Sequence, residues 1–160
     1  MTSFIGDYPC KVDVKGRITL PSAFKKQMDS SVDGRFVIKK DIYEQCLVLY
    51  PMDEWQRQIQ LLRSRLNPFN KTHNRFLREF SKGMIEAALD SNNRLLIPKR
   101  LLDAAGIDRE VVLAGQDDKI EIWDVDKYEQ IRSDENEFAK LAEEIMGGDD
   151  FNNLQKEQKD

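Results

Sequence analysis

Two aspartate–arginine pairs in this sequence have the spacing and the chemistry to form a braced hydrogen-bonding surface. Asp13 precedes Arg17 by four residues, and Asp90 precedes Arg94 by the same interval. A carboxylate and a guanidinium form strong, directional hydrogen bonds, so an aspartate across a tight turn would hold the arginine side chain in one direction. A guanidinium held in this way can donate two parallel hydrogen bonds to a guanine or to a phosphate. Lys15 lies within the first pair and could neutralise a phosphate.

The two pairs belong to an internal repeat. The segment Gly6–Pro21 recurs as Gly83–Pro98, and the glycine, the aspartate, the arginine and the proline keep one offset. A single aspartate–arginine pair is most often an exposed ion pair that contributes about 0–1 kcal/mol to stability. Two copies in register, each between an apolar strand pattern and an apolar-apolar-proline pattern, instead favour a shared role for the two turns.

Each repeat predicts the same series of elements around its turn. Two short strands are joined by a turn, in which Gly16 or Asn92–Asn93 supplies the left-handed backbone conformation. A short amphipathic helix, a β-hairpin and the start of a closing helix follow. In the first copy these elements fall at 22–28, 35–39 with 46–50, and 52–55; in the second they fall at 99–105, 109–114 with 119–123, and 125–128.

Helices are also predicted between the repeats and after the second repeat. Apolar residues recur at a helical period over 53–66, and Asn67–Pro68 ends that pattern. Further helices are expected over 71–80 and 135–146. The acidic, polar stretch that follows Gly147–Gly148 predicts a disordered tail, because it has few apolar residues to bury.

Charge is distributed unevenly along the chain. The formal net charge is −4, from 25 basic and 29 acidic residues, which by itself argues against a nucleic-acid partner. The tail from Asp134 onward holds most of the acidic excess, whereas 11–26 and Arg57–Lys82 are basic. Because salt screens charges beyond roughly 8–10 Å, the local charge decides what binds. Three interpretations of Arg57–Lys82 stay open: a solvated helix face, a nucleic-acid surface, or a contact for the acidic part of a neighbouring subunit.

Other kinds of site are poorly represented in the sequence. We find no Gly-rich phosphate loop, metal-ligand cluster or nucleophile with a base, so we expect no enzyme, no cofactor and no metal. His73 is the only histidine and lies in a basic segment without a partner. Cys10 and Cys46 are interpreted as apolar packing residues. No segment is typical of a membrane span or a secretory signal, so a cytoplasmic location without membrane association is expected.

The chain resembles the MraZ family. The resemblance rests on the paired Asp-x-x-x-Arg turns with their prolines, and on Phe4-Ile5-Gly6, Cys46-Leu47, Trp55 and Ile120–Trp123. It covers about the first 146 residues, and Asn93 departs from the glycine that usually precedes the arginine. The resemblance implies an α+β fold in which two tandem repeats form a pseudo-two-fold, swapped-hairpin β-barrel of the AbrB/SpoVT type, with helices flanking it.

The repeat and the resemblance together predict the organisation and the function of the chain. The predicted parts are a first module with its closing helix (1–66), a basic connecting helix (67–82), a second module with a C-terminal helix (83–146) and an acidic disordered tail (147–160). The resemblance implies a sequence-specific transcriptional regulator of the division and cell-wall gene cluster, associated with the nucleoid. Its partners would be double-stranded DNA with repeated promoter elements and further copies of the chain in a homo-oligomeric ring.

The repeated turns are the expected DNA-binding site. Arg17 and Arg94 would read bases or phosphates, Lys15 would contact a phosphate, and Asp13 and Asp90 would orient the arginines. One small β-ribbon binds weakly at cellular salt, so several hairpins along repeated DNA boxes would gain from a high effective concentration. The alternative is a protein-interaction scaffold, in which the same modules form a ring and their loops dock another protein.

Overall fold

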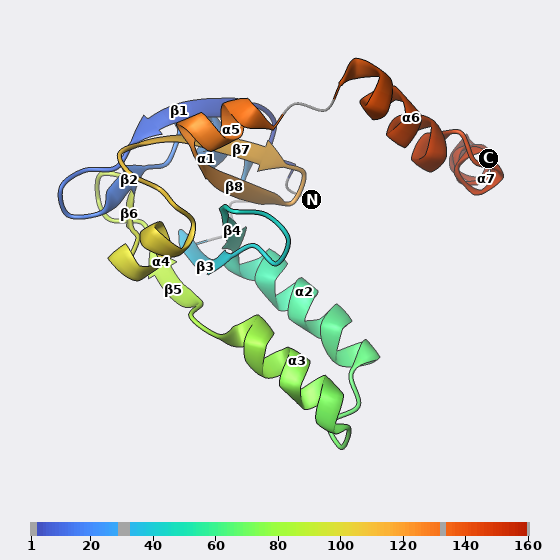
Figure 1. Ribbon diagram of the computed structural model, residues 1–160, viewed down its shortest axis with the longest axis horizontal. Helices are drawn as coiled ribbons and strands as arrows, with labels where there is room; N and C mark the ends of the chain where they lie inside the picture. The colour runs from blue at the N-terminus through green and yellow to red at the C-terminus, as the bar shows by residue number, and fades with distance from the viewer. Residues whose placement is uncertain (1–2, 29–32, 132–133, 160) are drawn as a thin grey trace. The chain divides into compact units, whose positions relative to one another are not determined.

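The computed structural model describes residues 3–28, 33–131 and 134–159, which form two compact units (Figure 1). The other positions, which belong to the predicted first and second modules and to the end of the tail, lie outside the described residues. The first unit is Met1–Tyr128, and the second is Glu129–Asp160. Both repeats fall within the first unit, so that unit contains the whole site predicted from the sequence.

The first repeat forms strands and helices at the positions that its pattern predicts. Its elements are β1 (Asp7–Lys11), β2 (Arg17–Thr19), α1 (Ser22–Gln27), β3 (Arg35–Lys40), β4 (Leu47–Pro51) and α2 (Met52–Arg65). Helix α1 begins directly after Pro21, where the missing N–H group of a proline needs no helical partner. Helix α2 confirms the helix predicted over 53–66, and it ends just before Asn67–Pro68.

The second repeat follows the same order after an intervening helix. The intervening helix is α3 (Lys71–Ser81). The elements of the second repeat are β5 (Ile85–Ala88), β6 (Arg94–Leu96), α4 (Lys99–Ala104), β7 (Glu110–Gln116), β8 (Lys119–Asp124) and α5 (Val125–Gln130). Asn70 caps α3, because its side chain accepts a hydrogen bond from the backbone N–H of His73. The helix predicted over 71–80 and both predicted hairpins are therefore confirmed.

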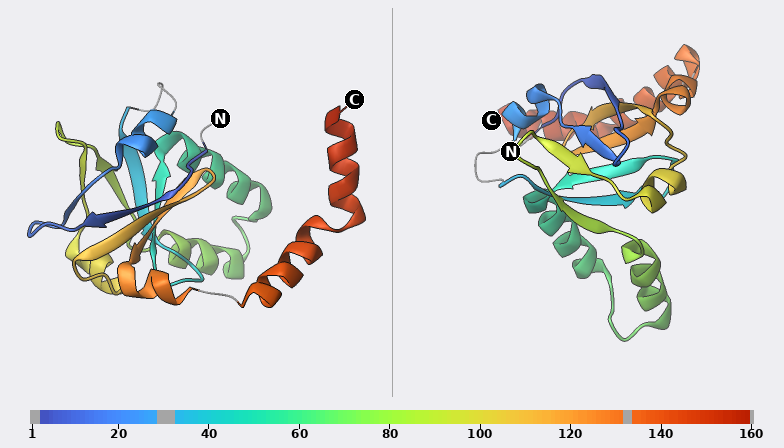
Figure 2. Two further views of the ribbon diagram at one scale, coloured as in Figure 1. Left: turned by 90° about the horizontal axis from the view of Figure 1, so that it is seen from above. Right: turned by 90° about the vertical axis from the view of Figure 1, so that its left-hand side faces the viewer.

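Strands of the two repeats interleave in one antiparallel sheet. The order is β1-β7-β8-β4-β3-β5, and a separate two-stranded sheet consists of β2 and β6. The first strand of each repeat pairs with the hairpin of the other repeat, β1 with β7 and β5 with β3. The two hairpins meet through β4 and β8, as the two views in Figure 2 show. Each repeat thus needs the other to complete its sheet and to bury its apolar face.

The six-stranded sheet is open. Strands β1 and β5 lie at its edges, and no ladder joins them within the part of the chain that the structure describes. Pro9 lies in β1, where an edge position tolerates the loss of one backbone N–H group. The α+β class predicted from the sequence is confirmed, but neither sheet closes on itself into a barrel.

The two-stranded sheet, which we call the β2–β6 ribbon, positions the predicted site. Successive strand residues point to opposite faces, and residues paired across the ribbon share a face. Ile18 and Leu95 form the inner face and are fully buried. The outer face carries both arginines of the repeated turns. The residue pairs across the ribbon are Arg17–Leu96, Ile18–Leu95 and Thr19–Arg94.

One apolar core holds the ribbon and the large sheet together. Phe24 of α1 is fully buried, and the rings of Phe4 and Tyr8 pack edge-on against it at centroid distances of 5.5 and 5.0 Å. Both repeats contribute residues to this cluster, so the core is shared between them. Its members include Ile18, Leu20, Phe36, Ile38, Leu47, Leu49, Leu95, Ile97, Leu113, Ile120 and Ile122.

The described residues of the second unit that follow position 133 form the helices α6 (Glu135–Met146) and α7 (Asp149–Lys159). Helix α6 confirms the helix predicted over 135–146. Helix α7 occupies the segment for which we predicted disorder. Its residues are mostly good helix formers, and Lys156 and Lys159 lie in its last turn, where positive charge favours a helix. Among the described residues, no helix has both the length and the apolarity to cross a membrane.

Truncating the buried face of the ribbon should destabilise the whole first unit. We expect Ile18→Ala to lower the free energy of unfolding by about 2–5 kcal/mol, because it removes a fully buried side chain from a shared core. Leu96→Ala is the matched control, since Leu96 lies on the outer face with 55% of its surface exposed. Denaturant unfolding measures both, and equal losses would contradict the assignment of the two faces.

Candidate nucleic-acid interface

The first turn is organised by one carboxylate. Oδ1 of Asp13 accepts hydrogen bonds from the backbone N–H groups of Lys15 and Arg17, both at 2.9 Å. Its other oxygen, Oδ2, accepts from Nε of Arg17 at 2.8 Å. Backbone bonds from Asp13 N to Arg17 O (2.9 Å) and from Gly16 N to Asp13 O (3.0 Å) close the turn. The same side chain therefore holds the backbone of the turn and the direction of the guanidinium.

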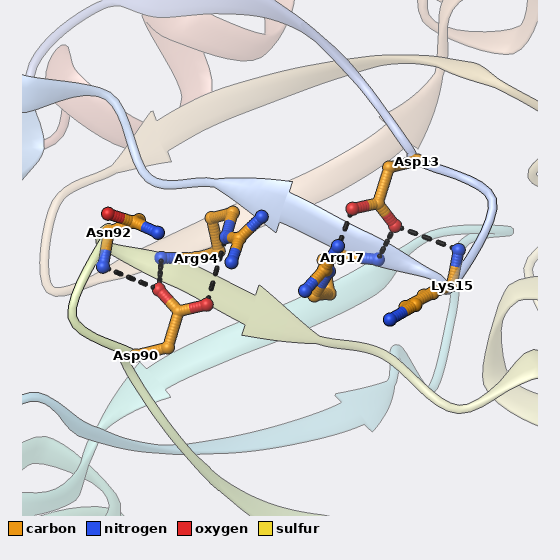
Figure 3. Close-up of polar contacts among 6 residues, drawn as sticks. All are labelled: Asp13, Lys15, Arg17, Asp90, Asn92 and Arg94. Carbon is orange, nitrogen blue, oxygen red and sulfur yellow. Dashed lines mark hydrogen bonds and ion pairs between the residues drawn. The ribbon is translucent and has the colours of Figure 1, made fainter.

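The second turn repeats this arrangement bond for bond. Oδ1 of Asp90 accepts from the backbone N–H groups of Asn92 and Arg94, and Oδ2 accepts from Nε of Arg94, all at 2.9 Å. The closing backbone bonds, Asp90 N to Arg94 O (2.9 Å) and Asn93 N to Asp90 O (3.0 Å), are also present. Figure 3 shows the two bracing networks on neighbouring strands. The ion pair expected within each Asp-x-x-x-Arg segment is thus present in both copies.

The residue before each arginine has a left-handed backbone. Gly16 has a φ of 89°, and Asn93 has a φ of 59°, so the asparagine supports the turn that the sequence predicts for the second copy. A Cβ atom added at Gly16 would lie only 2.8 Å from the backbone oxygen of Ile97, which leaves no room for a side chain. That contact exists because the backbone N–H of Ile97 donates to the carbonyl oxygen of Gly16 at 2.9 Å.

The two turns differ in what surrounds this left-handed residue. The side-chain oxygen of Asn93 accepts a hydrogen bond from Nζ of Lys25, which lies on α1 of the other repeat. Leu102 holds the position equivalent to Lys25, and a side chain at Gly16 would point towards it, with Leu102 Cδ1 at 3.9 Å from the added Cβ. A polar pair in one half thus corresponds to glycine and leucine in the other. Sequence reasoning missed Lys25, because only the fold brings it to Asn93.

Both arginines lie on the outer face of the β2–β6 ribbon. The side chains of Arg17 and Arg94 are 27% and 29% exposed, and the ion pairs with aspartate use Nε in both. Within the described ranges, neither arginine makes a hydrogen bond through its terminal Nη groups. These groups can therefore donate to a ligand. Lys15 is exposed at the tip of its turn, next to a fully exposed Val14.

The bracing bonds also keep the carboxylates charged. The pKa of Asp13 lies below its usual value chiefly because the backbone N–H of Arg17 donates to the carboxylate. The pKa of Asp90 is lowered in the same way by the backbone N–H of Arg94. Each guanidinium consequently faces a charged aspartate at neutral pH, which stabilises one orientation of its fork.

Part of the basic run 57–82 is neutralised within the fold. Nη2 of Arg57 lies 2.7 Å from Oε1 of Glu54 and 2.9 Å from Oδ2 of Asp118. Arg75 forms a longer, exposed pair with Glu79 at 3.6 Å. Five further basic residues of the run are exposed, and the three interpretations of the run stay open: Arg63, Arg65, Lys71, Arg78 and Lys82.

The remaining candidate residues have structural roles in the described part of the chain. His73 accepts a hydrogen bond at Nδ1 from the backbone N–H of Asn67, which braces the loop before α3. Cys46 is fully buried, in agreement with its interpretation as a packing residue. Burial also raises the pKa of the partly exposed Cys10 thiol. Among the described residues, no group of metal-ligating side chains comes together.

Fold and site define a tandem-repeat α+β protein that presents two braced arginines on one ribbon. Comparison with known proteins agrees with this class. The family model described as "MraZ protein, putative antitoxin-like" matches residues 3–79 and again 80–147. The chain belongs to the MraZ family.

Relatives from several bacteria carry the name Transcriptional regulator MraZ. The chain is 48% identical to the protein of Christiangramia forsetii over 96% of this chain and 99% of the relative. It is 44% identical to the protein of Flavobacterium psychrophilum over 92% and 94% of the two chains. It is 38% identical to the protein of Bacteroides fragilis over 91% of this chain and 92% of the relative. These relatives are named for the regulation of transcription rather than for catalysis, and the prediction that the chain is not an enzyme is confirmed on that ground.

The bracing of the turns should depend on pH in a defined direction. Because the pKa of both aspartates is lowered in the folded chain, the stability that they contribute is present above the ordinary aspartate pKa of about 3.9. It is lost only as the pH falls through the lower, folded pKa. We expect the amide resonances of Arg17 and Arg94 to shift with a midpoint below 3.9, measured by two-dimensional NMR.

Asn variants provide the control for this titration. Asp13→Asn should abolish the pH-dependent shift at Arg17 and leave that at Arg94 in place, and Asp90→Asn should do the reverse. A midpoint at or above the ordinary aspartate value in the wild type would contradict the observed hydrogen bonding.

Proposed function

We propose that the chain is a transcriptional regulator that binds specific sequences in double-stranded DNA through Arg17 and Arg94. The observation that carries this proposal is their placement on one outer face of the β2–β6 ribbon, each braced by its own aspartate. A two-stranded ribbon fits the major groove, and an arginine fork can donate to O6 and N7 of a guanine. The names of the relatives support regulation of transcription as the setting of this binding.

The other residues of the turns have supporting roles in the proposed complex. Lys15 contacts a phosphate, which adds affinity without reading sequence. Asp13 and Asp90 orient the arginines before DNA arrives. Because these side chains are already ordered, less conformational freedom is lost on binding. This arrangement gives the bracing carboxylates a function even though they repel the DNA backbone.

The strand exchange supports a relationship to the AbrB/SpoVT swapped-hairpin fold. In the proposed scheme the two repeats of one chain correspond to two interleaved copies of a single-module relative. The pairing of β1 with β7, of β5 with β3 and of β2 with β6 is what such interleaving requires. The boundaries 1–66 and 83–146 for the two modules, with 67–82 as a basic connector and 147–160 as an acidic tail, are part of this proposal.

A single ribbon offers few contacts, so the proposed regulator acts as an assembly. Several copies in a ring would place their ribbons along repeated promoter boxes, where each bound ribbon raises the effective concentration of the next. The family resemblance points to the promoter of the division and cell-wall gene cluster as the target and to the cytoplasmic nucleoid as the location. The outward position of both arginines is compatible with this arrangement.

Removing either arginine should weaken specific binding. Against a fragment of the promoter upstream of the chain's own operon, we expect Arg17→Ala and Arg94→Ala each to reduce affinity by roughly 5- to 150-fold, the loss for one good bidentate base contact. Binding to a shuffled duplex should change much less. Fluorescence anisotropy at several salt concentrations measures affinity and the number of phosphates contacted.

Arg75→Ala is a matched control for these variants. It removes the same charge from another arginine that pairs with an acidic residue four positions away, but on α3. Affinity for the promoter fragment should stay close to that of the wild type. If Arg17→Ala and Arg94→Ala also leave affinity and salt dependence unchanged, the DNA proposal is wrong and the scaffold alternative is favoured.

A further inference from the structure

The tips of the two turns present different side chains on the same backbone conformation. Val14 and Lys15 form the tip of the first turn, whereas Ser91 and Asn92 form the tip of the second. All four residues are exposed. Within the described ranges, the side chains of Lys15 and Asn92 make no hydrogen bond to the protein; their backbone N–H groups alone bond to the bracing aspartates.

The identical bracing makes the comparison between the tips informative. The backbone N–H of Lys15 and that of Asn92 donate to Asp13 and Asp90 at the same distance, 2.9 Å. Both tips are therefore held alike by the backbone, and what differs is the side chain that each one presents. Figure 3 shows Lys15 and Asn92 at the far ends of the paired strands, outside the two arginines.

The ribbon arranges these side chains in a line. Strands β2 and β6 are antiparallel, so the first turn adjoins the Leu96 end of β6 and the second turn adjoins the Thr19 end of β2. The order along the outer face is Lys15, Arg17, Arg94 and Asn92. The inner pair is chemically symmetric about the pseudo-two-fold axis, and the outer pair is not.

The two outer residues, Lys15 and Asn92, can hydrogen-bond to different groups of DNA. A lysine ammonium has only donors, so it serves phosphate oxygens and cannot accept a hydrogen bond from a base. An asparagine amide has a donor and an acceptor, and this pair matches N7 and the amino group N6 of an adenine in the major groove. The two ends of the line thus differ in whether they can recognise adenine.

We propose that Asn92 selects adenine at one end of each DNA box and that this makes the box directional. The proposal rests on the proposed function, and it adds a residue that sets specificity and an orientation of the chain on the DNA. Lys15, at the other end, supplies a phosphate contact without base preference. The asymmetry extends to the neighbouring side chains, since Lys25 donates a hydrogen bond to Asn93 at this end, whereas the equivalent positions at the other end hold Leu102 and Gly16.

Exchanging the tips separately and together tests the proposal. Binding sites would be selected from randomised duplexes with the full-length wild type and with Lys15→Asn, Asn92→Lys and the double exchange. We expect adenine at one end for the wild type, at both ends for Lys15→Asn and at neither end for Asn92→Lys. Replacing that adenine should cost the wild type roughly 5- to 150-fold in affinity.

Salt dependence gives a second readout of the same variants. Asn92→Lys adds one phosphate contact, so the slope of log affinity against log salt should steepen by about 0.9, and Lys15→Asn should flatten it by the same amount. The double exchange is the internal control. It should restore both the directional box and the wild-type slope, because the chain can then bind in the reversed orientation.

The outcomes separate this proposal from the one on which it rests. If the wild type selects no sequence at all, the proposed function fails. If all four proteins select one common box with the same end preferences, DNA recognition stands and the role of Asn92 is overturned. Lys15 and Asn92 are exposed, and within the described ranges their side chains make no hydrogen bond, so the exchanges should leave the fold intact. Circular dichroism of each variant checks this.

Discussion

The structure depends most on the double use of one carboxylate in each turn. Asp13 and Asp90 satisfy two backbone N–H groups with one oxygen and a guanidinium with the other. The conformation of the turn and the direction of the arginine are therefore set by the same side chain and cannot vary independently. A ligand that contacts these arginines finds their donor groups already in position. The conformational freedom of these side chains is lost when the chain folds, so less is lost when the ligand binds.

The ribbon turns two local motifs into one surface. The distance between Arg17 and Arg94 is set by the pairing of β2 with β6, two strands from different halves of the chain. A shift of that register by one residue would carry the arginines of one strand to the buried face. The register is held by Ile18 and Leu95, which are fully buried on the inner face. The apolar core thus fixes the strand register that places both arginines on the outer face of the ribbon.

Much of the local structure could be predicted from the sequence, because it depends on patterns of residues that lie close together in the chain. The repeat located both turns, Asn93 was recognised as a residue that tolerates a left-handed backbone, and periodicity located α2, α3 and α6. The pairing between the repeats could not be derived from these patterns, since it depends on contacts between distant segments. The hydrogen bond from Lys25 to Asn93 is of this kind. Helix α7 was missed because composition alone suggested a tail without order.

A structure of the chain bound to a duplex carrying a promoter box would show directly whether the two braced arginines contact DNA. We expect the Nη groups of Arg17 and Arg94 to donate hydrogen bonds to bases or phosphates of one duplex. We also expect Nε of each arginine to keep its hydrogen bond to Asp13 or Asp90. A complex in which the DNA lies on another surface and both guanidinium groups face solvent would contradict it.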